Sequence, residues 1–433
     1  MRIMWVTMSA IGKASQIFFG GRTQSGGWID ATCERLLPYT RNKEIELHIV
    51  ALGNQNITKY DQETNITYHM VSLQKFRGKS VTKKEVLAWH NIIEQIAPDL
   101  IQVWGTEFTF GRAIEFASKN IPVCFYIQGV MESLSQHPAG DIPLRKLFLQ
   151  TGIFSIFKFL SMKKEIRSNS KHVKFEAEMI KNADGVILDN EWTATQYAKY
   201  TNRFYNVPLA LNQSFLNKQW KKETCKVQTI FTVAGGASPI KGIHNVVIAL
   251  NSIKQKYPNV KLFIPGATAS ARPHFLYDTI FIRHLKKLIK KYDLQENVCF
   301  LGRLTPEQMA NQIVEANVFV MPSCVETHSS SLREAMTIGC PSISAGVGSV
   351  MEFVNHTENG FIYRYDDVDA IAYYVDKIFS NDEIAEKLSR NSKETLIVKY
   401  PQESIGEVLI DAYTKMINRK KQGVCDGNNE IEN

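Results

Sequence analysis

Residues 229–253, TIFTVAGGASPIKGIHNVVIALNSI, pass from a strand pattern through a turn to a helix pattern. The apolar run Thr229–Ala234 has the length of a buried strand, and the glycine pair beside its end predicts a tight turn. Beyond Gly242, apolar residues recur at helical spacing: Ile243, Val246, Val247, Leu250 and Ile253. A strand, a glycine-containing loop and a helix in this order open a doubly wound α/β domain.

The same alternation of short apolar runs and helical patterns extends over most of the chain. Strands are predicted at Ile3–Met8, Glu46–Leu52, Leu100–Trp104, Val123–Ile127, Gly185–Leu188, Thr229–Ala234, Lys261–Pro265, Val298–Leu301, Val318–Met321 and Ser342–Ala345. They form two sets, which predicts an α/β protein with two Rossmann-like doubly wound domains. The lysine-rich stretch Asn217–Lys226 separates the sets. We expect an N-terminal domain at 1–222, a second domain at 223–400, a last helix at 401–420 and a disordered tail at 421–433.

Composition is that of a soluble globular protein. Of the 433 residues, 44% are apolar and 22% are charged, and no run reaches the roughly 18 apolar residues that a membrane-spanning helix needs. These values exclude a disordered chain, a fibrous protein and a multi-span membrane protein. The seven cysteines are scattered and lack C-x-x-C spacing, which fits a reducing compartment and predicts neither a disulfide framework nor a zinc site.

No metal or cofactor site is predicted from the sequence. The histidines lack the spacing of metal ligands, and His244 is expected to be a surface residue. The sequence Asp367-Val368-Asp369 resembles a D-x-D metal motif, but a helical pattern follows it. Acids at a helix start are therefore the better interpretation.

The polar stretch after Met321 carries the strongest chemical signal. It reads PSCVETHSSSLREAM over residues 322–336, with Glu326 and Glu334 eight positions apart. A helix is predicted to begin near Ser331, so Ser329–Ser331 place hydroxyls and backbone N–H groups at a helix N-terminus, which binds anions. The loop follows a strand, and ligands of open α/β sheets bind at that edge.

Helix capping is the alternative explanation for part of this pattern. Ser331 with Glu334, and Ser349 with Glu352, have the spacing of capping boxes. Capping does not account for Glu326 or for three consecutive serines.

Two further loops carry candidate ligand-binding residues. Lys241 precedes a predicted helix, where the helix dipole disfavours a cation and a bound anion would reverse that effect. Gly26 and Gly27 follow the first strand and allow the backbone to approach a ligand closely. Each segment alone is also compatible with an ordinary surface position. The second loop lacks the G-x-G-x-x-G spacing of a dinucleotide site.

Taken together, these residues resemble family 4 glycosyltransferases, which are retaining enzymes of the GT-B fold. Glu326 and Glu334 match the E-x7-E motif of that family, Lys241-Gly242 its diphosphate-binding pair, and Gly26-Gly27 its first glycine loop. The resemblance covers nearly the whole chain and includes Trp104-Gly105-Thr106-Glu107. It implies two domains facing a cleft and a closing helix that returns to the first domain.

The resemblance also implies roles for individual residues. Glu334 binds the ribose hydroxyls of the donor, and Glu326 contacts the donor sugar near the reacting centre. Lys241 and the Ser329–Ser331 loop stabilise the leaving diphosphate, with Gly26 and Gly27 approaching from the other domain. The turn Gly302-Arg303-Leu304 is expected to line the base pocket. Glu107 and Gln128 are assigned to the acceptor side, and no metal is needed.

Two departures from the family pattern are visible. The family usually carries an Arg ahead of the lysine, near Gly236–Ala237 here, and it is missing. Many members have His-Gly where this chain has Gln128-Gly129. Because a glutamine side chain cannot usefully accept a proton, we do not expect a base at that position.

The net charge of +8 is concentrated in one window, between Arg145 and Lys174. Apolar residues at 147–160 are bracketed there by cations, which suits an anionic membrane surface. The cations assigned to membrane contact are Arg145, Lys146, Lys158, Lys163, Lys164 and Arg167. A buried helix with a solvated basic flank is the alternative interpretation. No nucleic-acid-binding motif accompanies the charge, so nucleic acid is not expected as a partner.

The expected function is therefore transfer of a sugar, with retention, from a UDP- or GDP-linked donor to a hydroxyl of a glycan or lipid-linked glycan. This places the chain in cell-surface polysaccharide biosynthesis, in the cytoplasm at the inner face of the cytoplasmic membrane. No cofactor is expected, because the nucleotide sugar is a co-substrate. A catalytically silent nucleotide-sugar-binding scaffold and a sugar-nucleotide epimerase of the same fold are the alternatives.

Overall fold

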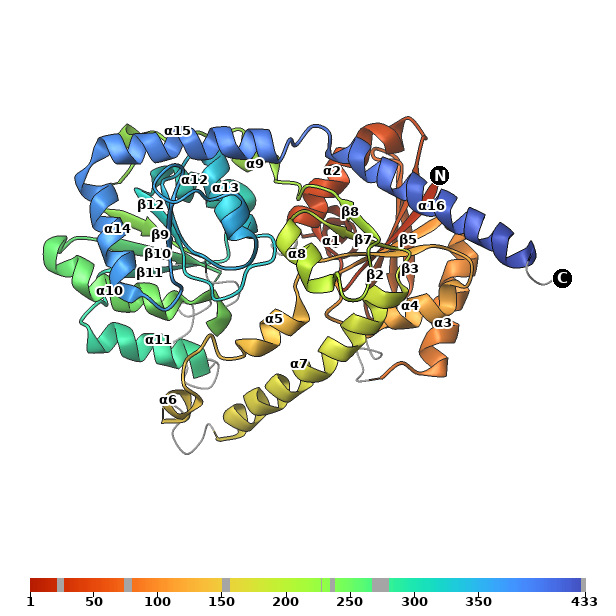
Figure 1. Cartoon of the computed structure of the whole chain (residues 1–433), viewed down its shortest axis with the longest axis horizontal. Helices are drawn as coiled ribbons and strands as arrows, with labels where there is room; N and C mark the ends of the chain where they lie inside the picture. The colour runs from red at the N-terminus through yellow and green to blue at the C-terminus, as the bar shows by residue number, and fades with distance from the viewer. Residues whose placement is uncertain are drawn as a thin grey trace. The chain divides into compact units, whose positions relative to one another are not determined.

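The computed structural model of the chain describes residues 1–21, 27–73, 80–149, 156–226, 228–233, 238–266 and 280–429 (Figure 1). They form two compact units. The first unit comprises Met1–Met131, Ser170–Ala210 and Gln402–Asn433, and the second comprises Glu132–Asn169 and Leu211–Pro401. This division differs from the expected boundary at 222/223, because Glu132–Asn169 join the second unit although first-unit segments flank them in the sequence.

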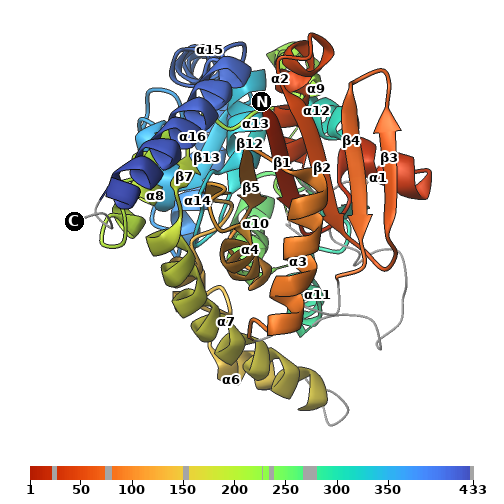
Figure 2. The ribbon, with the colours of Figure 1, turned by 90° about the vertical axis from the view of Figure 1, so that its right-hand side faces the viewer.

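The first unit is built on a sheet in the order β3-β4-β2-β1-β5-β6-β7-β8. The strands are β1 (Arg2–Thr7), β2 (Glu46–Leu52), β3 (Ile57–Asp61), β4 (Ile66–Val71), β5 (Leu100–Trp104), β6 (Val123–Tyr126), β7 (Gly185–Leu188) and β8 (Phe204–Asn206). All neighbours pair in parallel except the edge strand β3, which pairs antiparallel with β4 (Figure 2).

Both faces of this sheet are buried, which explains why its central strands are continuously apolar. In β1, Ile3 and Trp5 pack on one face, and Met4 and Val6 pack on the other. One face is covered by α1 (Gly12–Phe19), α2 (Gly27–Arg41) and α16 (Ile405–Asn429). The other is covered by α3 (Lys83–Ile96), α4 (Phe110–Ser118) and the last turns of α7 (Ile156–Asn182), while α8 (Glu191–Tyr197) follows β7.

Helix α16 belongs to the first unit although it ends the chain. Leu409, Tyr413 and Met416 are buried in the same cluster as β1. The Tyr413 hydroxyl accepts a hydrogen bond from Trp5 Nε1 at 2.8 Å and donates one to Gln102 Oε1 at 2.6 Å. The helix runs to Asn429, which differs from the disordered tail expected after residue 420.

The second unit contains a sheet in the order β11-β10-β9-β12-β13-β14, with all neighbours parallel. Its strands are β9 (Thr229–Phe231), β10 (Lys261–Pro265), β11 (Val298–Gly302), β12 (Val318–Met321), β13 (Ser342–Ala345) and β14 (Phe361–Tyr363). One apolar cluster unites this sheet with its helices. The prediction of an α/β protein with two Rossmann-like domains is therefore confirmed.

The helices of the second unit alternate with its strands. They are α5 (Met131–Gln136, which starts at the boundary), α6 (Leu144–Leu149), α9 (Gln213–Leu216), α10 (Ile243–Lys256), α11 (Ile280–Lys291), α12 (Pro306–Glu315), α13 (Ser330–Ile338), α14 (Val368–Ser380) and α15 (Asp382–Lys399). Short 3-10 turns lie at η3 (Lys222–Thr224), η4 (Pro239–Lys241) and η6 (Gly348–Glu352).

Candidate functional site

The order of the second sheet places a topological switch point between β9 and β12. From β9 the chain moves outward through β10 and β11, and from β12 it moves outward the other way through β13 and β14. The loops after β9 and β12 therefore leave the carboxyl edge of the sheet in opposite directions, which is where open α/β sheets bind ligands. Lys241 follows β9, and Glu326 and Ser329–Ser331 follow β12.

Glycine at position 242 and backbone hydrogen bonds hold these two loops together. Gly242 has φ +65°, and a Cβ there would lie 1.8 Å from the Pro322 carbonyl oxygen. The Cys324 N–H donates to the Ile240 carbonyl at 3.0 Å. Lys241 ends η4 and helix α10 begins at Ile243, so the lysine lies immediately before a helix start, as the sequence predicts.

Lys241 and Glu326 form an ion pair across the switch point. Lys241 Nζ lies 2.6 Å from Glu326 Oε1, and the two side chains are 34% and 9% exposed. Gly348, with φ +54°, fits against the Glu326 carbonyl oxygen, where a Cβ would lie 1.7 Å away. The more open partner is the lysine, so an incoming anion can reach its ammonium group.

Helix α13 presents unpaired groups at its N-terminus beside this pair. Ser329 has left-handed backbone angles (φ 51°, ψ 43°) and its side chain makes no capping bond. Its Oγ is buried and has no hydrogen-bond partner among the described residues. The first N–H groups of a helix have no partner within the helix. This end of α13 therefore offers donors to an anion.

The capping-box interpretations are wrong in both places. Ser331 lies inside α13, which begins at Ser330, so Glu334 is not its capping partner. Ser349 lies inside η6, whose preceding residue Val347 makes no side-chain cap. Each serine lies inside its helix because the helix begins earlier than expected: the residue before α13 is Ser329, in left-handed conformation, and the residue before η6 is Val347, whose side chain has no acceptor.

Glu334 is a half-buried carboxyl for which no hydrogen bond or ion pair is present among the described residues. It shares a helix face with Ser330, four positions earlier. Burial raises the pKa of Glu334 to about 8. A desolvated acceptor of this kind is satisfied by hydroxyl groups of a ligand.

The turn at Gly302–Leu304 lies at the same edge of the sheet, at the end of β11. Gly302 has φ +69° and its carbonyl accepts from the Gly266 N–H at 2.6 Å. Arg303 is exposed and Leu304 is half-buried. Strand β11 is three places from β12, about 14 Å at the usual spacing of strands.

The first unit has its own switch point, between β1 and β5. Gly105 follows β5 with φ +88°, and a Cβ there would lie 2.1 Å from Glu107 Oε2 and 3.5 Å from Gln128 Cδ. Glu107 and Gln128 are both half-buried, and the structure brings them together beside Gly105.

A buried carboxyl next to these two residues was not predicted. Glu176 of α7 is 2% exposed and accepts from Thr106 Oγ1 at 2.6 Å and from the Met131 N–H at 3.0 Å. Burial raises the pKa of Glu176 to about 7, and nearby Glu107 adds to this effect. The sequence offers one signal for it: Glu176 occupies a position on the apolar face of a helix, between Val173 and Ile180.

Of the predicted glycine pair, Gly26 lies outside the described residues. Gly27 is the first residue of α2, and a Cβ there would meet no atom within 4 Å. The structure thus leaves open space at this position. The loop residues 234–237, where the family arginine is missing, also lie outside the described residues.

Two expectations about polar residues have clear outcomes. His244 is buried against Phe281 at a ring distance of 5.9 Å, and burial lowers its pKa to about 4, so the expected surface position is wrong. Its side of α10 faces α11 rather than solvent. Asp367 caps α14 by accepting from the Ala370 N–H at 3.0 Å, which confirms the helix-start interpretation.

The basic window forms α6 and the first part of α7. Arg145, Lys146 and Lys164 are exposed, and the apolar side chains of Phe148 and Leu160 are 43% and 55% exposed beside them. The side chains of Lys158, Lys163 and Arg167 lie outside the described set. Across the described ranges, no helix is both long and apolar enough to cross a membrane.

Comparisons with known proteins address the fold and the family. Residues 214–395 match the family described as glycosyl transferases group 1. The chain is 28% identical over 173 residues to an uncharacterized glycosyltransferase of Methanocaldococcus jannaschii, covering 40% of this chain and 41% of that protein. It is 19% identical over 389 residues to the capsular polysaccharide biosynthesis glycosyltransferase CapM of Staphylococcus aureus, covering 89% of this chain and 94% of that protein.

Solved structures extend the likeness to the whole chain. The structure of HepE from Anabaena in complex with UDP and glucose matches with a TM-score of 0.67 at 13% identity, covering 96% of this chain and all of that one. At this low sequence identity, the structural likeness establishes a shared fold. The chain therefore has the α/β fold of the GT-B glycosyltransferases, and its residues 214–395 are related to the glycosyl transferases of group 1.

Proposed function

We propose that the chain is a retaining glycosyltransferase that moves a sugar from a nucleoside-diphosphate donor to a hydroxyl of a glycan acceptor. The observation that carries this proposal is the Lys241–Glu326 pair beside the open N-terminus of α13, at the switch point of the second sheet. At this point Lys241 supplies a cation, the start of α13 supplies N–H donors and Glu326 supplies a carboxylate. The UDP and glucose in the HepE complex and the group 1 match support the same assignment.

In the proposed reaction the bond between the anomeric carbon and the β-phosphate oxygen breaks, and negative charge develops on the diphosphate. Lys241 Nζ and the first N–H groups of α13 would stabilise that charge. Donors fixed in advance can lower a barrier by about 3–4 kcal/mol each. The protein's own groups would meet the diphosphate charge, so we propose that transfer needs no divalent metal on the phosphates.

Glu326 and Glu334 would hold the rest of the donor. Glu326, held by Lys241 in the free protein, would contact the donor sugar once the diphosphate engages the lysine. Glu334 would accept hydrogen bonds from the ribose hydroxyls, which relieves its desolvated, unpaired state. Gly302–Leu304 would line the base pocket at the end of β11, and the base would be that of UDP or GDP. Gly26 and Gly27 would let the backbone come close to the donor.

The first unit would take the acceptor. Glu107 and Gln128 offer oxygen atoms to sugar hydroxyls, and Gln128 cannot serve as a base. The acceptor oxygen would attack the anomeric carbon on the face that the diphosphate leaves, and the hydroxyl proton would pass to the leaving phosphate oxygen. Retention of configuration follows from this same-face route.

The acceptor is proposed to be a lipid-linked glycan in cell-surface polysaccharide biosynthesis. The name of CapM, a relative over 389 residues, supports the part of this proposal that concerns polysaccharide biosynthesis. Exposed Phe148 and Leu160 beside Arg145, Lys146 and Lys164 support contact with an anionic membrane surface. The protein would work in the cytoplasm as a peripheral protein at the inner face of the cytoplasmic membrane.

The donor site is tested by thermal unfolding of the full chain with UDP, GDP, ADP or CMP, each with and without magnesium. At 100 times its dissociation constant a ligand adds about 2.7 kcal/mol of stability. We expect a metal-independent shift with UDP or GDP that Lys241→Ala removes. No shift with any nucleotide would contradict the donor site.

Turnover separates the remaining alternatives. With the matching sugar nucleotide, we expect transfer to a glycan acceptor, and proton NMR of the product should show the anomeric configuration of the donor. An inverted product would contradict retention. Conversion into a second sugar nucleotide without acceptor would indicate an epimerase.

Sedimentation of the protein with anionic vesicles tests the proposed membrane contact. The sedimented fraction should fall when Arg145, Lys146 and Lys164 are changed to Gln, but not when Lys290 and Lys291 of α11 are changed.

A further inference from the structure

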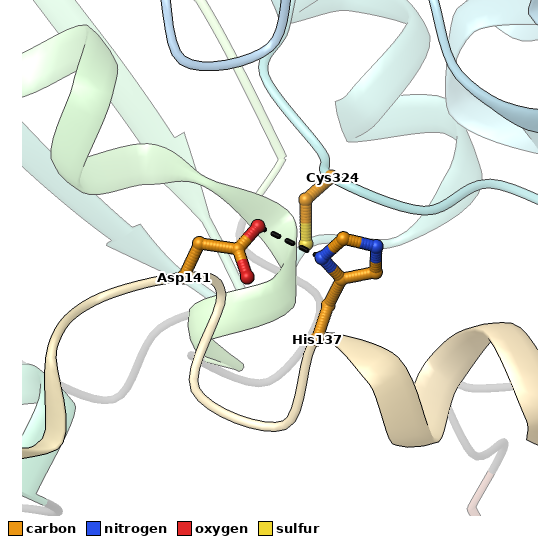
Figure 3. Close-up of side chains that lie close together, drawn as sticks. All are labelled: His137, Asp141 and Cys324. Carbon is orange, nitrogen blue, oxygen red and sulfur yellow. Dashed lines mark hydrogen bonds and ion pairs between the residues drawn. The ribbon is translucent and has the colours of Figure 1, made fainter.

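Three side chains with metal-binding atoms meet in the second unit: His137, Asp141 and Cys324 (Figure 3). Their ligand atoms all lie within 4.8 Å of one another. His137 Nδ1 is 2.8 Å from Asp141 Oδ2. His137 and Asp141 lie between α5 and α6, and Cys324 lies in the loop after β12. None of the three has a role in the proposed transfer.

Both contributing loops rest on the same turn, η4. Gly140 has φ +57° and packs so closely that a Cβ would lie 2.0 Å from the Pro239 carbonyl oxygen. Cys324 is held from the other side, because its N–H donates to the Ile240 carbonyl at 3.0 Å. The loop of His137 is closed by a hydrogen bond of 3.0 Å from the Gly140 N–H to the His137 carbonyl. The three side chains are thus positioned by backbone contacts that need no ligand.

The arrangement does not fit a nucleophilic cysteine activated by histidine. In such a relay the nucleophile and the carboxylate bond to different ring nitrogens of the histidine. Here Asp141 bonds to Nδ1, and Figure 3 shows the sulfur of Cys324 on that same side of the ring. Three donors that converge on one point, rather than in series, are the geometry of chelation.

We propose that His137 Nδ1, an Asp141 carboxylate oxygen and Cys324 Sγ form a binding site for a zinc ion. Zinc takes thiolate, imidazole and carboxylate ligands together, at about 2.0–2.3 Å each. Tetrahedral geometry then needs ligand atoms about 3.3–3.8 Å apart, so the side chains have to move by only a fraction of an ångström to about one ångström. A thiolate ligand disfavours magnesium and calcium, which prefer oxygen.

The site has an entry route and a structural consequence. His137 is half-buried and Asp141 is exposed, so an ion can arrive from solvent and meet the buried sulfur last. Binding replaces the thiol proton, which is released to solvent. Three protein ligands leave a fourth position for water or another ligand. The ion would join the loop of Cys324, two residues before Glu326, to the segment between α5 and α6.

Cobalt titration of the full, tag-free chain tests the proposal. Cobalt occupies zinc sites, and a thiolate ligand gives a charge-transfer absorption that tag or surface histidines do not. We expect a saturable thiolate–cobalt band that zinc abolishes by displacement and magnesium leaves unchanged. Cys324→Ser should remove the band, whereas the matched control Cys225→Ser, at another cysteine of the same unit, should retain it.

Two further variants keep the test decisive if Cys324→Ser fails to fold. His137→Ala and Asp141→Asn change more exposed side chains, and each should weaken zinc affinity at least tenfold while the melting temperature without metal stays near that of wild type. Zinc should also raise the melting temperature of wild type but not of His137→Ala. Absence of the band in wild type, or unchanged zinc affinity in both variants, would overturn the proposal.

Discussion

The two units place opposite chemistry at the same point of a similar sheet. At the switch point of the second unit, Lys241 and the N-terminus of α13 supply a cation and N–H donors. At the switch point of the first unit, Glu107 and Glu176 lie close enough for the charge of one to raise the pKa of the other. Both sheets reverse direction beside their first strand, so the difference lies in the segments that follow the strands and, for Glu176, in helix α7.

This difference indicates which substrate each unit can hold. A diphosphate is favoured by cations and helix N-termini and is repelled by carboxylates. Neutral sugar hydroxyls are favoured by carboxylate and amide oxygens, which accept hydrogen bonds. We therefore propose that the second unit holds the anionic donor and that the first unit holds an uncharged part of the acceptor.

Removal of the cation at the anionic site should have the largest effect. Lys241→Ala should lower the turnover of donor and acceptor at least a hundredfold, because one fixed donor at the leaving group is worth about 3–4 kcal/mol. Lys254→Ala is the matched control and should keep normal turnover, because Lys254 lies further along the helix that follows Lys241 and pairs with Asp293. Near-normal turnover of a folded Lys241→Ala protein would refute the assignment.

The glycines beside the two switch points should differ in their tolerance of alanine. Both have positive φ, which costs alanine about 1–2 kcal/mol. Gly242 also faces a backbone carbonyl at 1.8 Å, whereas Gly105 faces the movable end of the Glu107 side chain at 2.1 Å. Urea unfolding should show a loss of about 3 kcal/mol or more for Gly242→Ala and about 1–2 kcal/mol for Gly105→Ala. Equal losses would mean that the backbone at Pro322 moves to make room for the added methyl group at position 242.

A change at the acidic site should separate acceptor binding from donor binding. Glu107→Gln should raise the KM for the acceptor about tenfold, because a hydrogen bond to a charged acceptor is worth roughly 1.5–3 kcal/mol and an amide retains part of it. The thermal shift produced by the nucleoside diphosphate should stay unchanged. A weakened nucleotide shift would show that the first unit contributes to the donor site instead.

The effect of Glu334 should appear only as a dependence of stability on pH. The carboxyl ionises near pH 4.5 in the unfolded chain, but burial raises its pKa to about 8 in the folded chain. The folded chain therefore binds more protons between these values, and stability falls as pH rises through this window.

Glu334→Gln removes this group's contribution without removing a hydrogen bond among the described residues. The melting temperature of the variant relative to wild type should therefore rise from pH 5 to pH 8.5. Glu334→Asp, which keeps an ionisable group, is the matched control and should retain part of the slope. Parallel melting curves for wild type and the Gln variant across this range would contradict the raised pKa.

Periodicity predicted the central strands well because they are buried on both faces. The predicted bounds of Glu46–Leu52, Lys261–Pro265 and Val318–Met321 match β2, β10 and β12. Four strands were not predicted: β3, β8 and β14 at sheet edges, and β4 inside the first sheet, where Thr67 and His69 interrupt the apolar run. Strand β3 is polar and largely exposed, and β14 is only three residues long, so neither has the continuous apolar run that marks a central strand.

The sequence alone determined the α/β class, the alternation of elements, the loops that hold Lys241 and Glu326 and the helix that holds Glu334, because apolar periodicity and motif spacing are local properties. Only the tertiary structure decided that Glu176 lies beside Glu107 and that His137 and Asp141 meet Cys324. It also decided that Ser331 lies inside α13 and so does not cap it. These outcomes depend on close packing between segments far apart in the chain and on backbone angles such as those of Ser329, which no local pattern records.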